Sequence, residues 1–234
     1  MAGRIPRRAI RVWLQGHDRL PDHLRRLCDT FDELHPLWTL DWYDDERIRA
    51  EVDLREGREL YEHAERYVPD HSVHQLRADV ARYAILRQRG GVTLDCDYRW
   101  HRPIDELVAD ASAVLAYEKN DVWIACGFMG ARAGHTLFTK LLAGLPANAA
   151  RHRPSVRVLG ANVISGPKYL TPVVEALGPR EDLRLLPDHL LHAVPWNRWN
   201  QTPDGPQHPD AYATHVWAHQ RGIAGVDNGA WRTW

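Results

Sequence analysis

The sequence predicts a soluble α/β protein built as a single domain. Strand-like and helix-like stretches alternate along its 234 residues, a pattern typical of helices layered on a sheet. A chain of this length with 44% hydrophobic residues can bury a full core. No internal repeat or low-complexity linker divides it, so we expect one domain over residues 1–234.

Composition and charge argue against several classes of protein. The 30 Lys and Arg residues balance 31 Asp and Glu residues, which leaves no global basic field for nucleic acid or an anionic membrane. No apolar run approaches the ~20 residues that span a bilayer, and the N-terminus lacks the apolar core of a secretory signal. The three cysteines form no CxxC pair. We therefore expect a cytoplasmic protein with no nucleic-acid partner and no transmembrane segment.

The first third of the chain carries two predicted strands and two helical stretches. Residues 9–14 are predicted to form a first strand that ends at Gly16, and residues 38–43 a second strand. Between them, residues 21–34 have apolar side chains at helical spacing. Residues 44–66 are very polar and are predicted to be helical.

A helix that ends at Gly90-Gly91 is the most informative predicted element. Ser72 and Gln75 have the spacing of a capping box at its start. Asp79 and Arg82 fall together at the edge of its apolar face, three residues apart. Such a pair is commonly a solvated surface pair worth a few tenths of a kcal/mol. Its position directly before an acidic strand end favours a role in a site. The predicted apolar face consists of Val73, Leu76, Val80, Tyr83 and Ala84.

Two aspartates follow the next predicted strand, in the stretch GGVTLDCD. Residues i and i+2 of a strand point to the same side, so Asp95 and Asp97 can face one ligand while Cys96 points into the core. Two carboxylates at the end of such a strand suit Mg²⁺ or Mn²⁺. An Asp-x-Asp also arises by chance in a chain rich in Asp, so the pair alone is a weak signal.

The second half continues the alternation. Residues 113–117 and 122–129 are predicted strands, and residues 135–145 a helix. Residues 196–209 are rich in Pro, Asn, Asp and Gln, which is a loop composition. No HxH or HxxxH spacing accompanies the carboxylates, which argues against a metal-dependent phosphoesterase.

Five blocks, in order, resemble the DXD-containing sugar transferases of glycosyltransferase family 32. This family includes the yeast initiating α-1,6-mannosyltransferase and bacterial capsule or lipopolysaccharide transferases. RADVARYAILRQRGGVTLDCD is similar to its central block. The other blocks are IPRRAIRVWLQG, GFMGARAGHTLFTKLL, ISGPKYLTPVVEAL and ATHVW.

The resemblance implies a GT-A fold and a retaining hexosyltransferase. Residues 1–130 would be a Rossmann-like nucleotide-binding half, and residues 131–234 the acceptor side with a C-terminal lid. The donor would be a UDP-sugar or GDP-mannose, and the acceptor a glycan, a lipid or another hydroxyl compound. A non-catalytic descendant that binds nucleotide sugar or glycan is the alternative, because Ala218 to Arg221 replace the family's usual closing residues.

The resemblance also implies roles for individual residues. Asp95 and Asp97 would hold Mn²⁺ or Mg²⁺ against the donor diphosphate, and Asp79 and Arg82 would contact the donor sugar. Trp13 would stack on the base, although a Trp in a first strand is also common in ordinary cores.

Further implied contacts come from the second half of the chain. Asn162 would bond sugar hydroxyls, and Gly166 and Pro167 would shape the turn beneath the sugar, although ordinary turn roles fit all three. His215 would complete the shell of the metal, and Trp217 would face the diphosphate, from a lid of residues 196–221 that closes over the bound donor. A packed Trp beside an incidental His is the simpler interpretation.

Overall fold

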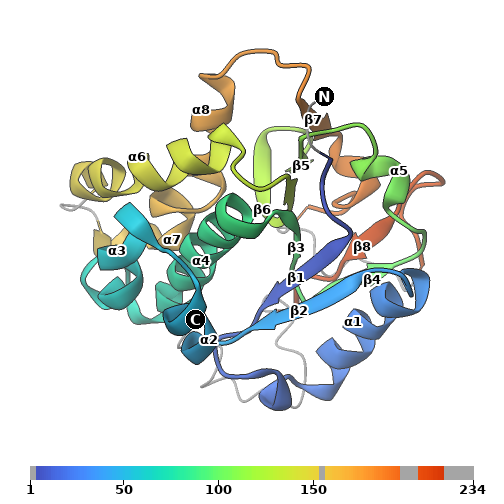
Figure 1. The fold of residues 1–234 in the computed structure, drawn as a ribbon, viewed down its shortest axis with the longest axis horizontal. Helices are drawn as coiled ribbons and strands as arrows, with labels where there is room; N and C mark the ends of the chain where they lie inside the picture. Colours follow the sequence, from blue (N-terminus) through green and yellow to red (C-terminus); the bar gives the residue numbers. More distant parts are fainter. Residues whose placement is uncertain (1–3, 153–155, 196–204, 219–234) are drawn as a thin grey trace.

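A six-stranded sheet lies at the centre of the protein, with helices on both sides (Figure 1). The computed structural model describes residues 4–152, 156–195 and 205–218. The strand order is β2-β1-β3-β6-β5-β7. These strands are β1 (Arg8–Val12), β2 (Thr39–Tyr43), β3 (Gly91–Leu94), β5 (Ala113–Glu118), β6 (Trp123–Ala131) and β7 (Leu183–Leu186).

The sheet is parallel except at β6, which runs against both of its neighbours. The predicted α/β class is confirmed, and the strands predicted at 9–14, 38–43, 113–117 and 122–129 lie within two residues of β1, β2, β5 and β6. β7 was not predicted, because three of its four residues are only partly buried or exposed and the apolar pattern is weak.

Side chains that alternate along each strand divide the core into two layers. Ile10 and Leu115 face one layer, whereas their neighbours Ala9 and Val114 face the other. The first layer contains α4 (Val73–Arg89), α6 (Thr136–His152), α7 (Val156–Ile164) and α8 (Pro167–Glu175). The second contains α1 (Asp22–Leu34), α5 (Asp105–Val108) and the two-stranded sheet of β4 (Tyr98–Trp100) and β8 (Ala213–His215).

Helix α4 is buried along almost its whole length. It ends at Gly90 as predicted, where φ is +66° and an added Cβ would lie 2.6 Å from the backbone nitrogen of Ala133. The predicted capping box is wrong. A 3₁₀ turn over Asp70–Ser72 leads directly into the helix, so Ser72 already has near-helical dihedrals and its side chain makes no capping bond.

The helix predicted over residues 44–66 is instead a series of short pieces. Its α-helical parts are α2 (Asp45–Glu51) and α3 (Arg58–Glu62), joined by 3₁₀ turns. Asp44 caps α2 by accepting a bond from the Arg47 backbone N–H at 2.8 Å. Each piece buries only one or two large side chains, Ile48 in α2 and Leu60 and Tyr61 in α3. The chain therefore has to bend to bring each of them to the core.

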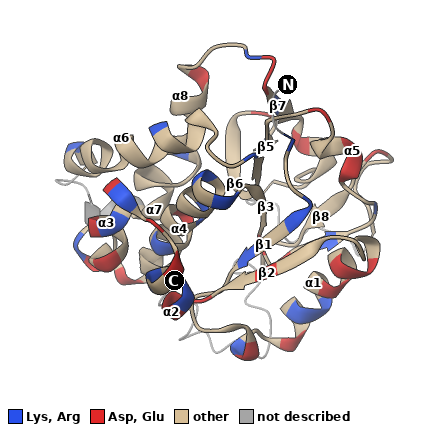
Figure 2. Ribbon diagram, in the orientation of Figure 1, with Lys and Arg blue, Asp and Glu red and all other residues tan. Residues whose placement is uncertain are grey.

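Charged residues lie mainly on the helices and connections, and both signs are interspersed there (Figure 2). Strands β3 and β6 contain none. Asp95 and Asp97, just beyond the end of β3, are therefore acidic groups placed at the end of an uncharged strand. No helix in the described ranges has the length and apolarity needed to cross a membrane.

Candidate functional site

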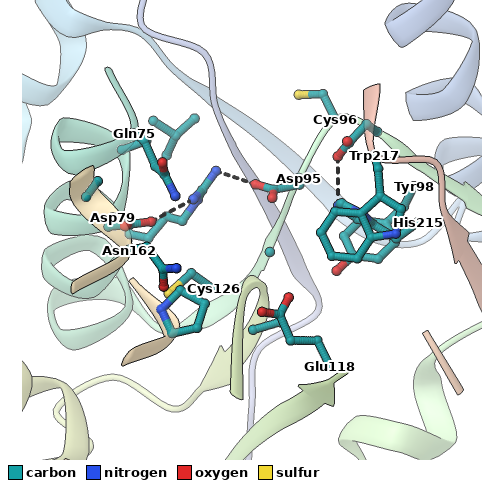
Figure 3. A pocket seen from close by; sticks show the side chains of 18 of the residues that line it. Gln75, Asp79, Asp95, Cys96, Tyr98, Glu118, Cys126, Asn162, His215 and Trp217 are labelled. Carbon is teal, nitrogen blue, oxygen red and sulfur yellow. Dashed lines mark hydrogen bonds and ion pairs between the residues drawn. The ribbon is translucent and has the colours of Figure 1, made fainter. Parts of the chain in front are cut away.

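A cavity of about 540 Å³ opens where β1, β3 and β5 end. The carboxyl ends of parallel strands meet at one edge of a sheet, where ligands of α/β proteins commonly bind. Figure 3 shows that side chains from α4, from the turn after β3, from β5 and from the segment of His215 converge on this cavity. The cavity joins residues that are more than 130 positions apart in the sequence.

Asp95 and Asp97 lie in a tight turn between β3 and β4, not on a strand as predicted. β3 ends at Leu94, and the backbone N–H of Asp95 donates to the Gly127 carbonyl at 2.9 Å. A Cβ on Gly127 would lie 2.8 Å from the Asp95 carboxylate, so this glycine leaves room for the acidic group. Both aspartates nevertheless line the cavity. Cys96 also lines it and packs in an apolar cluster with Cys28 and Leu24.

Arg82 joins the buried Asp79 to the partly exposed Asp95 in a chain of charges. The Arg82 guanidinium donates to Asp79 at 3.2 Å and also to Asp95. The second oxygen of Asp79 accepts a bond from the Ser165 hydroxyl at 2.8 Å. Asp79 is 1% exposed, and this burial raises its pKa to about 6 although Arg82 and Ser165 act in the opposite direction. The pair is therefore not the solvated surface pair considered above.

His215 reaches the aspartates through pairing of the small sheet, in which Tyr98 lies opposite His215. Its Nε2 is 3.0 Å from Asp97. The other oxygen of Asp97 accepts the backbone N–H of Ala218 at 3.0 Å. Burial alone would lower the pKa of His215, but the nearby carboxylates, Asp97 first and then Asp95 and Glu118, together outweigh burial and raise the pKa. These carboxylates therefore favour the charged form of the imidazole.

Trp217 packs against His215 with ring centroids 4.0 Å apart. Its backbone has φ of +53°, an uncommon value for a residue other than Gly. The indole N–H donates to the Val194 carbonyl at 2.8 Å. The resemblance implied that Trp217 faces the diphosphate. Because its indole N–H is bonded to Val194 in this conformation, Trp217 contributes its ring face to the site. Of the predicted lid over 196–221, residues 196–204 and 219–221 lie outside the described residues.

Asp95, Asp97 and His215 fit a divalent cation. They offer ligand atoms that all lie within 4.8 Å of one another. Carboxylate oxygens with one imidazole suit Mn²⁺, and carboxylates suit Mg²⁺. The buried Nδ1 of His215 has no hydrogen-bond partner among the described residues. A buried polar atom of this kind is costly, which fits a site that is completed by a polar ligand.

The other predicted residues have different positions relative to the cavity. Trp13 lines the cavity and also packs in an apolar cluster, so its position fits both a base-stacking residue and a core residue. Asn162 and Pro167 line it as well. Gly166 does not. An added Cβ there would lie 2.7 Å from the Asn162 Cα, so Gly166 permits close packing between the end of α7 and the start of α8.

Glu118 is a cavity residue that the sequence interpretation missed. It is the last residue of β5 and its side chain points into the cavity (Figure 3). Burial raises its pKa to about 7, with Asp95 adding to the effect and His215 opposing it. A signal was available, because Glu118 directly follows the strand predicted at 113–117, just as Asp95 follows β3.

His192 and Ser165 were also missed. The Tyr117 carbonyl can only accept, so Nδ1 of His192 donates to it at 2.8 Å and Nε2 accepts from the Tyr98 hydroxyl. Burial lowers the pKa of His192 to about 3, which keeps the ring neutral. Tyr98 in turn packs edge-on to His215, with centroids 4.5 Å apart. Nothing local in the sequence indicates this support, because its members come from three separate segments.

Known proteins resemble this chain in sequence and in fold. Residues 21–114 match the family described as "Glycosyltransferase sugar-binding region containing DXD motif". An uncharacterized glycosyltransferase of Acanthamoeba polyphaga mimivirus is 26% identical over 136 residues, which is 57% of this chain and 53% of the viral protein. This chain therefore aligns with about half the length of that relative.

Three solved structures share the fold at low sequence identity. The PaToxG glycosyltransferase is 11% identical with a TM-score of 0.57, over 75% of this chain and 71% of its own. The UDP-bound glycosyltransferase domain of the YGT toxin is 9% identical with a TM-score of 0.57, over 78% and 79%. Mouse xyloside xylosyltransferase 1 is 11% identical with a TM-score of 0.56, over 89% and 96%. The fold is thus of the GT-A type, as expected.

Proposed function

We propose, from the match of residues 21–114 to the DXD-containing glycosyltransferase sugar-binding family, that this protein transfers a hexose from a nucleotide sugar to a hydroxyl acceptor. The observation that carries the proposal is the convergence of a possible cation site, Asp95, Asp97 and His215, with the buried Asp79–Arg82 pair in one cavity. We place the protein in glycosyltransferase family 32 and treat residues 1–234 as one catalytic domain. We also propose a cytoplasmic location, in which the free, buried cysteines Cys28, Cys96 and Cys126 would stay reduced.

Asp95, Asp97 and His215 would hold Mn²⁺ or Mg²⁺ beside the donor diphosphate. When bound, the cation would offset the negative charge that develops on the leaving nucleoside diphosphate. Asp97 is fixed for this role by the backbone N–H of Ala218, and His215 by its packing between Tyr98 and Trp217. Preorganised ligands need little rearrangement to bind a cation.

Asp79 and Arg82 would orient the transferred sugar. Arg82 bridges Asp79 and Asp95, so it connects the sugar-binding carboxylate to the proposed cation site. Asp79 is held by Ser165, which limits its rotation. Asp79 would accept hydrogen bonds from sugar hydroxyls, and Asn162 at the cavity wall would add an amide contact.

The nucleotide would lie on the side of the cavity formed by Trp13, His71 and Gln75. Trp13 supplies an aromatic surface for the base, and Gln75 an amide that can donate and accept. The YGT toxin domain was solved with UDP bound, which supports a uridine nucleotide here by analogy of fold alone. We propose a UDP-sugar as donor and keep GDP-mannose as the alternative.

Retention of configuration requires the acceptor hydroxyl to attack from the face that the diphosphate leaves. A donor phosphate oxygen would take the proton of that hydroxyl, so no protein base is needed, and we assign no protein nucleophile. Glu118 lies at the end of β5 with its side chain in the cavity, and would hold the acceptor through a hydrogen bond to one of its hydroxyls. A hydroxyl is common to glycan, lipid and small-molecule acceptors, so this contact with Glu118 does not select among them.

Incubation with Mn²⁺ and a panel of UDP-sugars and GDP-mannose tests the proposal. We expect release of nucleoside diphosphate from one donor and little from the others. Calorimetric binding of UDP and GDP to the same preparation separates the alternatives. Tight nucleotide binding without release from any donor, with glycan acceptors present, would indicate a non-catalytic nucleotide-sugar-binding descendant.

A further inference from the structure

We propose that His189, His208 and Asp210 bind a zinc ion at a second site outside the cavity. The three residues offer ligand atoms that all lie within 4.8 Å of one another. The two imidazole rings are in contact, with centroids 4.5 Å apart. Nδ1 of His208 is 3.8 Å from the Asp210 carboxylate. None of these residues belongs to the glycosyltransferase site described above.

Backbone contacts position both halves of this cluster. His189 lies in the 3₁₀ turn η6 (Asp188–Leu190), whose first residue is bonded to the β5–β6 connection at Asn120 and Asp121. His208 and Asp210 lie in the segment before β8. The Tyr212 backbone N–H donates to the Leu190 carbonyl at 2.9 Å, which joins this segment to η6. The ligands are therefore held together by the main chain and not only by flexible side chains.

The donor set favours zinc over the ion proposed for the cavity. Two imidazoles and one carboxylate are a common zinc set, with water as the fourth ligand. Mg²⁺ prefers an all-oxygen environment, and imidazoles shift the preference toward later transition metals. Asp95, Asp97 and His215 contain the opposite ratio of carboxylates to imidazole. His189 and His208 are partly exposed, so the ion can enter directly from solvent.

Zinc at this position would join the two segments that continue into the cavity. His192 follows η6 by two residues, and His215 lies five residues after Asp210. Their rings lie 5.5 Å apart inside the site. An ion bound by His189, His208 and Asp210 would therefore stabilise the approach of β8 to the cavity without touching substrate.

Titration calorimetry with Zn²⁺ tests the site in an Asp97→Ala background, which removes one of the three proposed cavity ligands and so weakens metal binding there. We expect one saturable zinc site in this background. His189→Ala or His208→Ala should weaken zinc binding by roughly 100-fold or more, since even outer-shell partners of a metal cost about 10–100-fold. His63→Ala is the matched control, because His63 is a surface histidine of similar side-chain exposure, 37% against 40% for His208. It should leave binding unchanged.

Cobalt substitution gives an independent readout of the ligand set. Co²⁺ in a four-coordinate His/carboxylate site should give visible absorption that disappears in His189→Ala and persists in His63→Ala. Absence of saturable zinc binding in the Asp97→Ala protein, or equal binding after His189→Ala, would overturn the proposal. The measurement needs no nucleotide sugar, so its outcome is separate from that of the proposed transferase function.

Discussion

Replacement of Arg82 by Met should destabilise the protein strongly, because it leaves a buried carboxylate without its cation. The Asp79 side chain is 1% exposed and that of Arg82 is 11% exposed. After the replacement, the Ser165 hydroxyl still donates to Asp79, but a hydroxyl cannot neutralise the charge. Methionine fills a similar length of space, so the loss would come mainly from electrostatics and hydrogen bonding.

We expect the free energy of unfolding at pH 7 to fall by about 3–5 kcal/mol, the range for breaking one partner of a buried ion pair. Urea denaturation followed by circular dichroism measures this loss. Arg89→Met is the control on the same helix, because Arg89 pairs with the exposed Glu51 and such a pair contributes about 0–1 kcal/mol.

Adding Asp79→Asn to Arg82→Met should recover a large part of the lost stability, because the buried charge is then gone and the amide can still accept from Ser165. A loss below about 1 kcal/mol for Arg82→Met, or an equal loss with and without Asp79→Asn, would refute the reasoning. In that case the carboxylate would be solvated by water or would already be neutral.

Three further results are expected. Asp79→Ala should reduce donor hydrolysis far more than nucleoside diphosphate affinity, because the lost contacts are to the sugar ring; equal losses in both would assign Asp79 to the fold. His215→Ala should weaken nucleoside diphosphate binding in calorimetry only when Mn²⁺ is present, and a loss that does not depend on the metal would remove His215 from the cation site. The pKa of Glu118, about 7, lies above its ordinary 4.5, so its contribution to stability is complete below pH 4.5 and is lost as the pH rises through 7. Between pH 4.5 and pH 7, the free energy of unfolding of the metal-free wild type should fall by about 1–3 kcal/mol more than that of Glu118→Gln, allowing for the partial exposure of Glu118. Urea denaturation at several pH values measures this difference, and parallel pH profiles of the two proteins would contradict it.

The sheet and the central helix could be predicted because their signals are local. Apolar runs bounded by glycine indicate β1 and β3, and Gly90 in a left-handed conformation ends α4 at the predicted residue. Segments with weak apolar patterns were misjudged, as residues 44–66 show. Their short helices depend on the separate burial of Ile48 and Leu60, which only the tertiary structure imposes.

Several residues of the candidate site could be predicted from the sequence, but the contacts that hold them together could not. Asp95 and Asp97 were selected by assuming a strand, yet they converge because a turn and the N–H of Ala218 hold them. Ser165 and His192 act through contacts across 86 and 94 residues, to Asp79 and Tyr98 respectively. Contacts over such separations leave no pattern in a single sequence. Glu118 could have been found by applying the strand-end argument to every predicted strand.

The most direct test of sugar transfer in this cavity is to compare the release of nucleoside diphosphate by wild type and by Asp97→Ala, each with and without Mn²⁺. The matched control is Asp29→Ala, an exposed carboxylate on the surface of α1. With the preferred donor, wild type and Asp29→Ala should release nucleoside diphosphate when Mn²⁺ is added and lose this activity when a chelator removes it. Asp97→Ala should be inactive in both conditions while it retains the circular dichroism of the wild type. Full activity of Asp97→Ala in metal-free buffer would contradict the account.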